Sequence, residues 1–306
     1  MPEERFHRRQ AAWRDRGERT AFVLAALAEA LDEIERLRGL RVGGETVSRR
    51  QGEFKSWDAE VFRVDQEIED GFLRRLQSLG TPLTLLSEEA GRVVVGEGPP
   101  QLYAVADPFD GSWLLKRGIR DFWYSSLALF DAERRPVCCA VADAVHGTVA
   151  FADASGARLA RLEGDRLADC VTVDRAYRAS MGRPDVTDPA QAGIESYAMK
   201  PARFLLPLVD TYRVVLEPFK FFLPNGGPYG FVDVALGRVD VYFAPRQPFV
   251  DVFSGIQIAE QAGAMVTDFS GRPVTLDDEP ESLHDVLATT NRALHERVLD
   301  LIARCR

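Results

Sequence analysis

Two amphipathic helices dominate the hydrophobic pattern of the first eighty residues. In residues 20–40 apolar side chains recur every three or four positions, from Phe22 to Leu37. The same spacing returns in residues 64–79 and stops at Gly80. Apolar residues spaced in this way line one face of an α-helix. Each segment therefore predicts a helix that packs on a core.

Short apolar runs, separated by clusters of glycine, proline and aspartate, follow the second helix. Runs of this kind predict β-strands. Several strands after paired helices favour an antiparallel sheet with helices on one face. The predicted strands are residues 83–86, 102–106, 125–130, 137–141 and 148–151, followed by a hairpin over residues 156–168.

The second half of the chain alternates helical and strand patterns, which is typical of α/β layering. Residues 181–192 are rich in proline, aspartate and glycine and have no period, so we place a domain boundary there. The prediction is an N-terminal α+β domain, residues 1–180, with most candidate ligands, and a C-terminal α/β domain, residues 181–306, that contributes Asp251. The predicted elements of the second domain are helices 204–214, 251–262 and 291–303, strands 239–243 and 264–267, and a loop at 224–229.

Composition and charge narrow the classes of partner. The 306 residues carry a net charge of −9, which makes nucleic acids and anionic membranes poor default partners. The chain has no apolar run near 18 residues, and its charged start lacks the apolar core of a signal peptide. Four cysteines, two of them the adjacent Cys138 and Cys139, do not make a disulfide framework. We therefore expect a soluble, cytoplasmic protein.

The segment Asp107-Pro108-Phe109-Asp110-Gly111-Ser112 is the most informative one. It follows an apolar strand, so two carboxylates emerge where the strand ends, and glycine allows a sharp turn. Carboxylates attract a hard cation, and the amides of a helix that starts at Ser112 attract an anion. Together they predict a site for a metal-bound phosphate. Taken alone, the segment is equally compatible with an aspartate-rich turn.

Three further acidic positions stand at the ends of predicted elements. Glu88 and Glu89 follow the strand 83–86, Asp65 opens the second helix, and Asp251 opens the helix 251–262. By themselves the glutamates are compatible with a solvated loop and the two aspartates with helix N-caps. Their combination with the segment at 107–112 is what indicates a site.

In this order and spacing, the motifs resemble the inositol monophosphatase superfamily, over roughly residues 20–300. Its central signature, Asp-Pro-(apolar)-Asp-Gly-(Ser/Thr), is matched fully by residues 107–112. Its distal signature is matched by Asp251, the run Glu260-Gln261-Ala262-Gly263-Ala264 and the strand end Thr267-Asp268. The resemblance implies a layered α-β-α-β-α sandwich and a magnesium-dependent phosphatase, as in archaeal-type fructose-1,6-bisphosphatases. Many members of the superfamily are inhibited by lithium, and many are homodimers.

The resemblance also implies a cofactor and its ligands. Two or three Mg²⁺ ions are expected, with Mn²⁺ as a substitute, and all-oxygen ligands favour these ions over zinc. Glu88 would also support the attacking water, and Asp107 would bind two ions. The implied metal ligands are Glu88, Asp107, the carbonyl of Phe109, Asp110, Asp251 and, for a loosely held third ion, Asp65.

For the substrate, the resemblance implies that Gly111 and Ser112 donate amides to the phosphate, beside Asp110. The hydroxyl of Ser112, with Glu88 and Asp65, would position the nucleophilic water. Lys55 resembles a family lysine on a mobile loop near the active site, although an ordinary surface lysine is the alternative.

Substrate identity is left open by the sequence. Residues 243–248 contain no carboxylate, and Arg246 could bind a second phosphate, with Lys220 and Arg203 as further candidates. This favours a bisphosphorylated sugar slightly over inositol monophosphate, unless Arg246 is simply a surface arginine. Residues 225–230 are rich in glycine but lack the Lys-Ser/Thr of a phosphate-binding loop, and we interpret them as a turn near the substrate site.

Two alternatives remain. One is a 3′(2′),5′-bisphosphate nucleotidase of the same superfamily, for which no adenine pocket can be identified. The other is a catalytically weak, metal-binding regulatory homologue. Loss of a metal carboxylate would mark the latter, yet all five carboxylates are present. The sequence therefore favours an active phosphatase.

Overall fold

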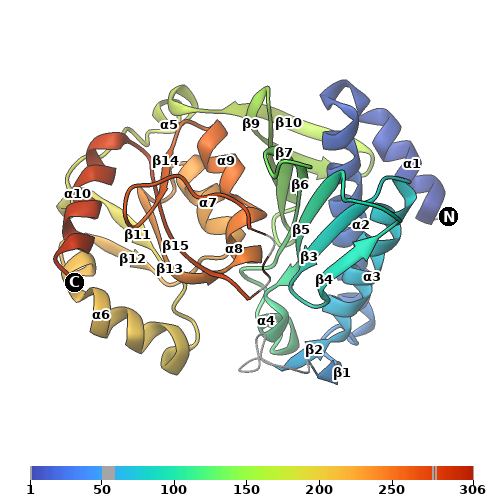
Figure 1. Cartoon of the computed structure of the whole chain (residues 1–306), viewed down its shortest axis with the longest axis horizontal. Coiled ribbons are helices and arrows are strands. Elements are labelled where there is room, and N and C mark those ends of the chain that lie inside the picture. Colours follow the sequence, from blue (N-terminus) through green and yellow to red (C-terminus); the bar gives the residue numbers. More distant parts are fainter. Residues whose placement is uncertain (1, 50–58, 278, 280, 306) are drawn as a thin grey trace.

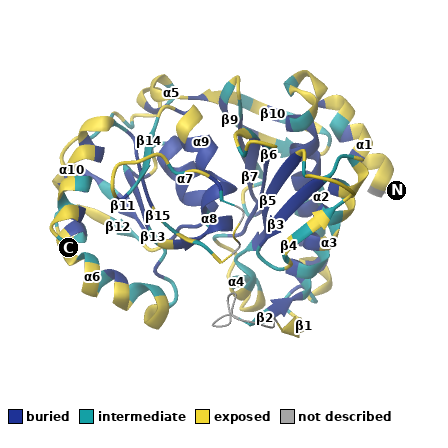
Figure 2. Cartoon of the chain, in the orientation of Figure 1, coloured by how far each residue is buried: buried dark blue, intermediate teal, exposed yellow. Residues whose placement is uncertain are grey.

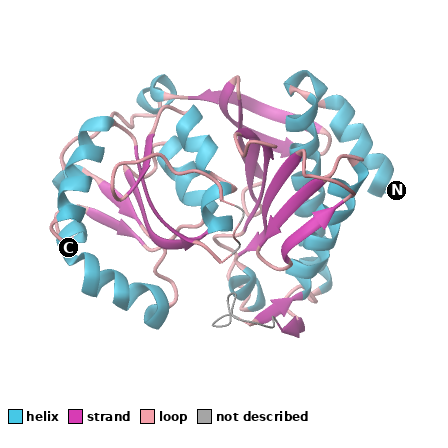
Figure 3. Ribbon diagram, in the orientation of Figure 1, coloured by secondary structure: helices cyan, strands magenta, loops and turns pink. Residues whose placement is uncertain are grey.

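Two β-sheets alternate with layers of helices in the computed structural model, which describes residues 2–49, 59–277, 279 and 281–305 (Figures 1 and 3). Within those residues, three clusters of buried apolar side chains fill the spaces between the layers. Figure 2 shows the result: the sheets and the central helices are buried, whereas the outer helices are exposed on their far sides. This is the layered α-β-α-β-α sandwich that the resemblance implies.

The first layer consists of helices on the N-terminal side of the molecule. The two helices predicted at 20–40 and 64–79 are confirmed, because their apolar faces are buried against the neighbouring sheet. An additional N-terminal helix was not predicted. The helices of this layer are α1 (Pro2–Ala12), α2 (Glu18–Leu40) and α3 (Arg63–Ser78).

The eight-stranded sheet forms the second layer. Its neighbouring strands are antiparallel except for β3 and β5, which run parallel, so the prediction of a purely antiparallel sheet is wrong for this pair. The reason is that the chain makes a hairpin from β3 to β4 and then returns on the other side of β3. In spatial order the strands are β10 (Arg166–Val173), β9 (Gly156–Glu163), β8 (Thr148–Asp153), β7 (Pro136–Asp143), β6 (Tyr124–Asp131), β5 (Leu102–Asp110), β3 (Leu83–Ser87) and β4 (Gly91–Val95).

Helices cover both faces of this sheet, and the prediction of helices on one face is wrong. The central strands are buried along nearly their whole length rather than at alternate positions, so each face needs a cover. The second cover comes from the other half of the chain. Its helices are α7 (Pro228–Ala235), α8 (Phe249–Phe253) and α9 (Ile256–Gln261).

The five-stranded sheet and two outer helices complete the sandwich. In spatial order the strands are β12 (Phe221–Leu223), β11 (Gly193–Glu195), β13 (Val241–Pro248), β15 (Leu283–Thr289) and β14 (Met265–Asp268), and the helices are α6 (Leu206–Leu216) and α10 (Arg292–Ala303). Both helices and the strands β13 and β14 agree with the prediction. The short strands β11 and β12, the strand β15 and the helix α7 were not predicted. The remaining elements are β1 (Thr46–Arg49), β2 (Glu60–Phe62), α4 (Ser112–Lys116), α5 (Arg175–Ser180), the 3-10 turns η1 (Arg14–Arg16) and η3 (Pro189–Gln191), and the π-helical turn η4 (Pro201–Leu205).

The helix predicted over residues 251–262 is two short helices, α8 and α9, which meet at Gly255. A Cβ atom at this glycine would lie 2.4 Å from the carbonyl oxygen of Pro228, so the backbone of α7 packs directly against the break. Close packing of α7 has therefore replaced the continuous helix that the periodicity predicts.

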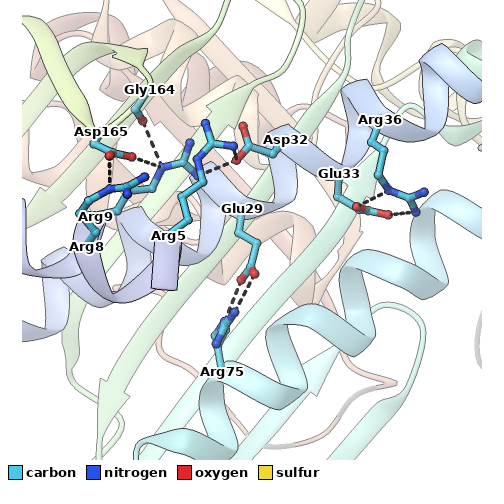
Figure 4. A network of polar contacts seen from close by, with 10 residues as sticks. All are labelled: Arg5, Arg8, Arg9, Glu29, Asp32, Glu33, Arg36, Arg75, Gly164 and Asp165. Carbon is cyan, nitrogen blue, oxygen red and sulfur yellow. Dashed lines mark hydrogen bonds and ion pairs between the residues drawn. The ribbon is translucent and has the colours of Figure 1, made fainter. Parts of the chain in front are cut away.

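Ion pairs hold helix α1, which explains why hydrophobic periodicity does not reveal it. Arg9 is 3% exposed, and its guanidinium lies 2.8 Å from Asp32 of α2 and donates to the carbonyl of Gly164 at 3.1 Å. Arg5 also pairs with Asp32, at 2.9 Å (Figure 4). A helix with so many charged positions carries little apolar signal, and its buried guanidinium is visible only in the tertiary structure.

The four cysteines are free thiols, of which Cys138 and Cys139 are buried in β7. Among the helices of the described residues, none has the length and apolar character needed to cross a membrane. The division into domains at residues 180 and 181 stays a prediction.

A buried arginine ties the layers of the second half together. Arg178 of α5 is 2% exposed and donates to the carbonyl oxygens of Ala262 at 3.1 Å, Thr290 at 3.3 Å and Ala235 at 3.4 Å. These carbonyls lie next to the last residues of α9, β15 and α7. One guanidinium therefore satisfies backbone acceptors from three elements.

We predict that Arg178→Met lowers the free energy of unfolding by about 2–4 kcal/mol, because buried carbonyls lose their donor. Urea unfolding in EDTA measures the change. The control is Arg175→Ala, whose side chain is 81% exposed and should change stability by less than about 0.5 kcal/mol. Equal urea midpoints for Arg178→Met and the unmodified protein would contradict this role.

Candidate functional site

The parallel pair β3 and β5 places two of the predicted ligands side by side. Ser87 is the register partner of Ala106, so the next residues of the two strands, Glu88 and Asp107, are neighbours at the same edge of the sheet. The backbone amide of Glu88 donates to the carbonyl of Ala106 at 3.3 Å, which continues the pairing. Asp107 is 1% exposed. The acidic edge thus follows directly from the strand register.

Strand β5 does not end before the acidic motif, as the sequence suggested, but continues through it to Asp110. A bulge between Asp107 and Asp110 lets the pairing resume with Tyr124 of β6. The chain then turns at Gly111, whose φ is +115° and whose Cβ, if present, would lie 2.5 Å from the carbonyl oxygen of Phe122. The predicted sharp turn is confirmed, and helix α4 starts at Ser112 as predicted.

Asp65 serves as a helix cap and as a site residue at once. Its side chain accepts a hydrogen bond from the backbone amide of Phe62 at 2.9 Å, at the start of α3. Its other oxygen accepts from the hydroxyl of Ser112, which also lies 2.9 Å from the carbonyl oxygen of Phe109. The capping role predicted for Asp65 is confirmed, and its role as a metal ligand stays a prediction.

Asp110 and Asp251 meet across the boundary of the two sheets, at the backbone of Gly227. A Cβ atom at Gly227 would lie 2.8 Å from Oδ2 of Asp110 and 3.9 Å from Oδ1 of Asp251. The residue also has a φ of +63°, which favours glycine. Asp251 lies in the first turn of α8 and is not its N-cap, because Pro248 occupies that position. The acidic residues of the two halves thus approach one point in space.

The electrostatic effect of these carboxylates is visible at Tyr242 of β13, which is fully buried. Burial first, and then the neighbouring carboxyl groups, with Asp251 the largest contributor among them, raise the pKa of its phenol well above the ordinary value. The phenol is therefore neutral.

The donor set fits a hard divalent cation. Buried carboxylates that approach one another raise the free energy of the folded state unless a cation or a proton neutralises them. Carboxylate and carbonyl oxygens are the donors that Mg²⁺ and Mn²⁺ prefer. Over residues 2–49, 59–277, 279 and 281–305, no three acidic, histidine or cysteine side chains converge tightly enough to form a complete metal site. The carboxylates are instead grouped in pairs, and Asp110 and Asp251 both border the position that a side chain at Gly227 would occupy.

The cationic candidates are placed less closely. Lys55 lies outside the described residues. Arg246 is exposed, at a bulge of β13 with a φ of +51°, and its amide donates to Asp285 at 2.9 Å. Lys220 is exposed just before the edge strand β12.

Arg203 belongs to a turn that contacts the glycine loop through neighbouring residues. It belongs to the turn η4, whose Phe204 packs edge-to-face on Tyr197 at 4.8 Å. The Cβ of Tyr197 lies 2.9 Å from the position of a Cβ at Gly226. The turn η4 is thus joined to the loop that carries Gly227.

Sequence reasoning undervalued that loop, Asn225-Gly226-Gly227. The turn predicted over residues 225–230 is right for residues 225–227 and wrong for residues 228–230, which begin α7. Its position near the substrate site stays a prediction, and its approach to Asp110 and Asp251 in particular was not predicted. Two consecutive glycines ahead of Pro228, which starts α7, were the available signal.

Comparisons with known proteins agree with this geometry. A family model described as "Inositol monophosphatase family" matches residues 17–306. A fructose-1,6-bisphosphatase/inositol-1-monophosphatase of Thermococcus kodakarensis is 26% identical over 281 residues, which cover 91% of this chain and 95% of that protein. A fructose-1,6-bisphosphatase of Pyrococcus furiosus is 26% identical over 247 residues, which cover 79% and 84%.

A solved structure gives the same result for the fold. It is a hypothetical protein from Pyrococcus horikoshii with similarities for inositol-1 monophosphatase, at 20% identity. It superimposes with a TM-score of 0.68, over 92% of this chain and 96% of that one.

We predict that Gly227→Ala weakens Mn²⁺ binding by about tenfold or more, because the new Cβ would displace the carboxylate of Asp110. The dissociation constant is measured from the free Mn²⁺ signal in electron paramagnetic resonance.

The matched control is Gly80→Ala, at a glycine with a φ of +62° whose Cβ, if present, would have no atom within 4 Å. Gly80→Ala controls for a positive φ but not for the ψ of −155° at Gly227, a conformation that is nearly restricted to glycine, so urea unfolding of both variants accompanies the affinity measurement. Unchanged Mn²⁺ affinity in Gly227→Ala would mean that the loop does not border a metal site.

Proposed function

The chain belongs to the inositol monophosphatase family and is a sugar-phosphate phosphatase, and we propose that its substrate is a small phosphorylated sugar or cyclitol, hydrolysed with Mg²⁺. Fructose 1,6-bisphosphate and inositol monophosphate are the two candidates. The observation that carries the proposal is the approach of Asp110, from strand β5, and Asp251, from helix α8, to the backbone of Gly227.

We propose that Glu88, Asp107, Asp110, Asp251 and the carbonyl of Phe109 hold two Mg²⁺ ions, and that Asp65 holds or orients a third. The strand register and the contacts around Gly227 support this assignment. When bound, such ions neutralise a phosphate dianion and lower the pKa of a water molecule.

The chain's own groups would then orient the reactants. The hydroxyl oxygen of Ser112, which lies next to Asp65, can accept a hydrogen bond from the attacking water. Glu88 can accept a second hydrogen bond from the same water. The amides of Gly111 and Ser112 stand at the start of α4, where backbone amides suit phosphate oxygens. Fixed donors of this kind stabilise the charge of the transition state.

For substrate choice, we propose that Arg246 binds a second phosphate, with Arg203 and Lys220 as additional cations and Lys55 near the reacting phosphate. The names of the relatives from Thermococcus kodakarensis and Pyrococcus furiosus support a bisphosphorylated sugar. The contact between the turn η4 and the loop at Gly226 supports Arg203 in particular.

The cell compartment and the assembly are also proposals. The four free thiols support a cytoplasmic location. The frequent occurrence of homodimers in the family supports a homodimer. Likewise, we propose that residues 1–180 and 181–306 act as two domains with the site between them.

We predict that Asp107→Asn and Glu88→Gln each abolish phosphate release from fructose 1,6-bisphosphate and inositol 1-phosphate with Mg²⁺, to about the level seen with EDTA. Each substitution removes a negative charge that the ions require but keeps the shape of the side chain. Circular dichroism checks that the fold is intact.

The control for this experiment is Glu89→Gln, which changes the neighbouring carboxylate and should retain most of the activity. If either Asp107→Asn or Glu88→Gln kept near-normal turnover, the metal assignment would be wrong.

We predict that Arg246→Gln raises the KM for fructose 1,6-bisphosphate about tenfold or more and leaves the KM for inositol 1-phosphate unchanged. The reason is that the guanidinium would bind only the second phosphate. Steady-state kinetics on both substrates make the comparison, with adenosine 3′,5′-bisphosphate as a third.

Equal effects on both substrates would remove Arg246 from the substrate site. Preference for the adenosine compound would favour the nucleotidase alternative. A folded protein that binds Mn²⁺ but hydrolyses none of the three would favour the regulatory homologue.

A further inference from the structure

The loop that approaches Asp110 and Asp251 is itself held from behind by a buried polar residue. Asn225 is 2% exposed, and its side-chain amide donates to Oε1 of Glu195 at 3.0 Å. Glu195 is the last residue of β11 and is fully buried. The loop is thereby anchored to the five-stranded sheet two residues before Gly227.

Glu195 has a second neighbour, the carboxyl group of Asp233 in α7. Burial, followed by the charge of Asp233, raises the pKa of Glu195 well above its ordinary value. Burial also raises the pKa of Asp233, but the guanidinium of Arg238 opposes that change. Ionisation of Glu195 is therefore opposed both by burial and by its acidic neighbour.

The network continues from Asp233 to the other sheet. Arg238 donates to Oδ1 of Asp233 at 3.0 Å and to the hydroxyl of Tyr229 at 2.9 Å. That hydroxyl donates to Oδ2 of Asp143 at 3.2 Å, at the end of β7. Since α7 carries both Tyr229 and Asp233, these bonds fix the helix against both sheets.

The end of this hydrogen-bond network at Tyr229 lies close to the acidic site. The ring of Tyr229 stacks on Tyr124 with centroids 4.0 Å apart and planes 8° from parallel. Tyr124 is the strand partner of Asp110. The same network therefore reaches Asp110 from two directions, through the backbone of Gly227 and through the strand β6.

We propose that Glu195 and Asn225 are positioning residues for the two ligands Asp110 and Asp251, because the hydrogen bond from Asn225 to Glu195 fixes the loop whose backbone at Gly227 borders both carboxylates. The proposal rests on the proposed function, since it assigns Asp110 and Asp251 to a metal. It extends that function to residues that touch neither metal nor substrate.

Three variants separate positioning from simple burial. Glu195→Gln keeps the bond from Asn225, because the carbonyl oxygen of its side chain accepts as Oε1 does. Glu195→Leu removes that bond, and Asn225→Ala removes the anchor of the loop from the other side. The control Thr20→Val removes a hydrogen bond of 2.9 Å to Asp153, at an equally buried residue of the first helical layer.

The first readout is the Mn²⁺ dissociation constant, measured by electron paramagnetic resonance. Urea unfolding in EDTA checks the stability of each variant. Glu195→Leu and Asn225→Ala should raise the dissociation constant about tenfold or more, as the loss of residues that support metal ligands does. Glu195→Gln and Thr20→Val should leave it within about twofold. Unchanged affinity in Glu195→Leu, or an equal loss in Glu195→Gln, overturns the proposal.

The second readout is amide hydrogen exchange of residues 225–231 in EDTA, which needs no metal. Exchange should be faster in Glu195→Leu and unchanged in Glu195→Gln. If the unmodified protein binds no Mn²⁺, the proposed function fails. Faster exchange in Glu195→Leu would then show that Glu195 holds the loop without a role in metal binding, and the positioning proposal fails together with the proposed function. If exchange is unchanged in Glu195→Leu, Glu195 does not hold the loop, whether or not the protein hydrolyses a phosphate ester.

Discussion

Mutual repulsion of neighbouring carboxylates, which are buried or partly buried, is the constraint on which the rest of this structure depends. Asp110 of β5 and Asp251 of α8 approach the same glycine, while Glu88 and Asp107 share a strand edge. Placing several like charges in a region of low dielectric is unfavourable without a counter-charge. The surrounding fold must therefore hold these groups close and supply stability from elsewhere.

That stability comes from the layers on both sides of the site. The central helices cover one face of each sheet, and large apolar clusters fill both interfaces. A fully buried guanidinium, Arg178, satisfies carbonyls near the ends of three elements. The acidic edge itself lies where the two sheets face each other across α7 and α8, a usual place for a ligand site.

Hydrogen bonds, more than apolar contacts, determine the shape of the site. Asp65 caps α3 and contacts Ser112, so the start of one helix is tied to the turn that begins another. On the opposite side, Asn225 and Glu195 hold the glycine loop. Directional bonds of this kind fix relative positions more narrowly than packing alone, and a catalytic constellation requires such narrow tolerances.

The chain by itself determined the identity of the acidic residues, the two long helices of the N-terminal half and the layered class of fold. Those features are encoded locally, in apolar periodicity and in the short motif at Asp107 to Ser112, and they need no knowledge of distant contacts. The motif also matched the family that the whole-chain comparison supports.

Tertiary structure decided what depends on contacts between remote segments. The parallel pairing of β3 and β5 places Glu88 beside Asp107, and the approach of Gly227 to Asp110 joins residues more than a hundred positions apart. Helix α1 escaped detection because most of its positions are charged or polar, although ion pairs and the buried Phe6 hold it against α2. The break at Gly255 exists because α7 packs against it. Local propensity carries no information about such partners, since their energies arise only when the chain is folded.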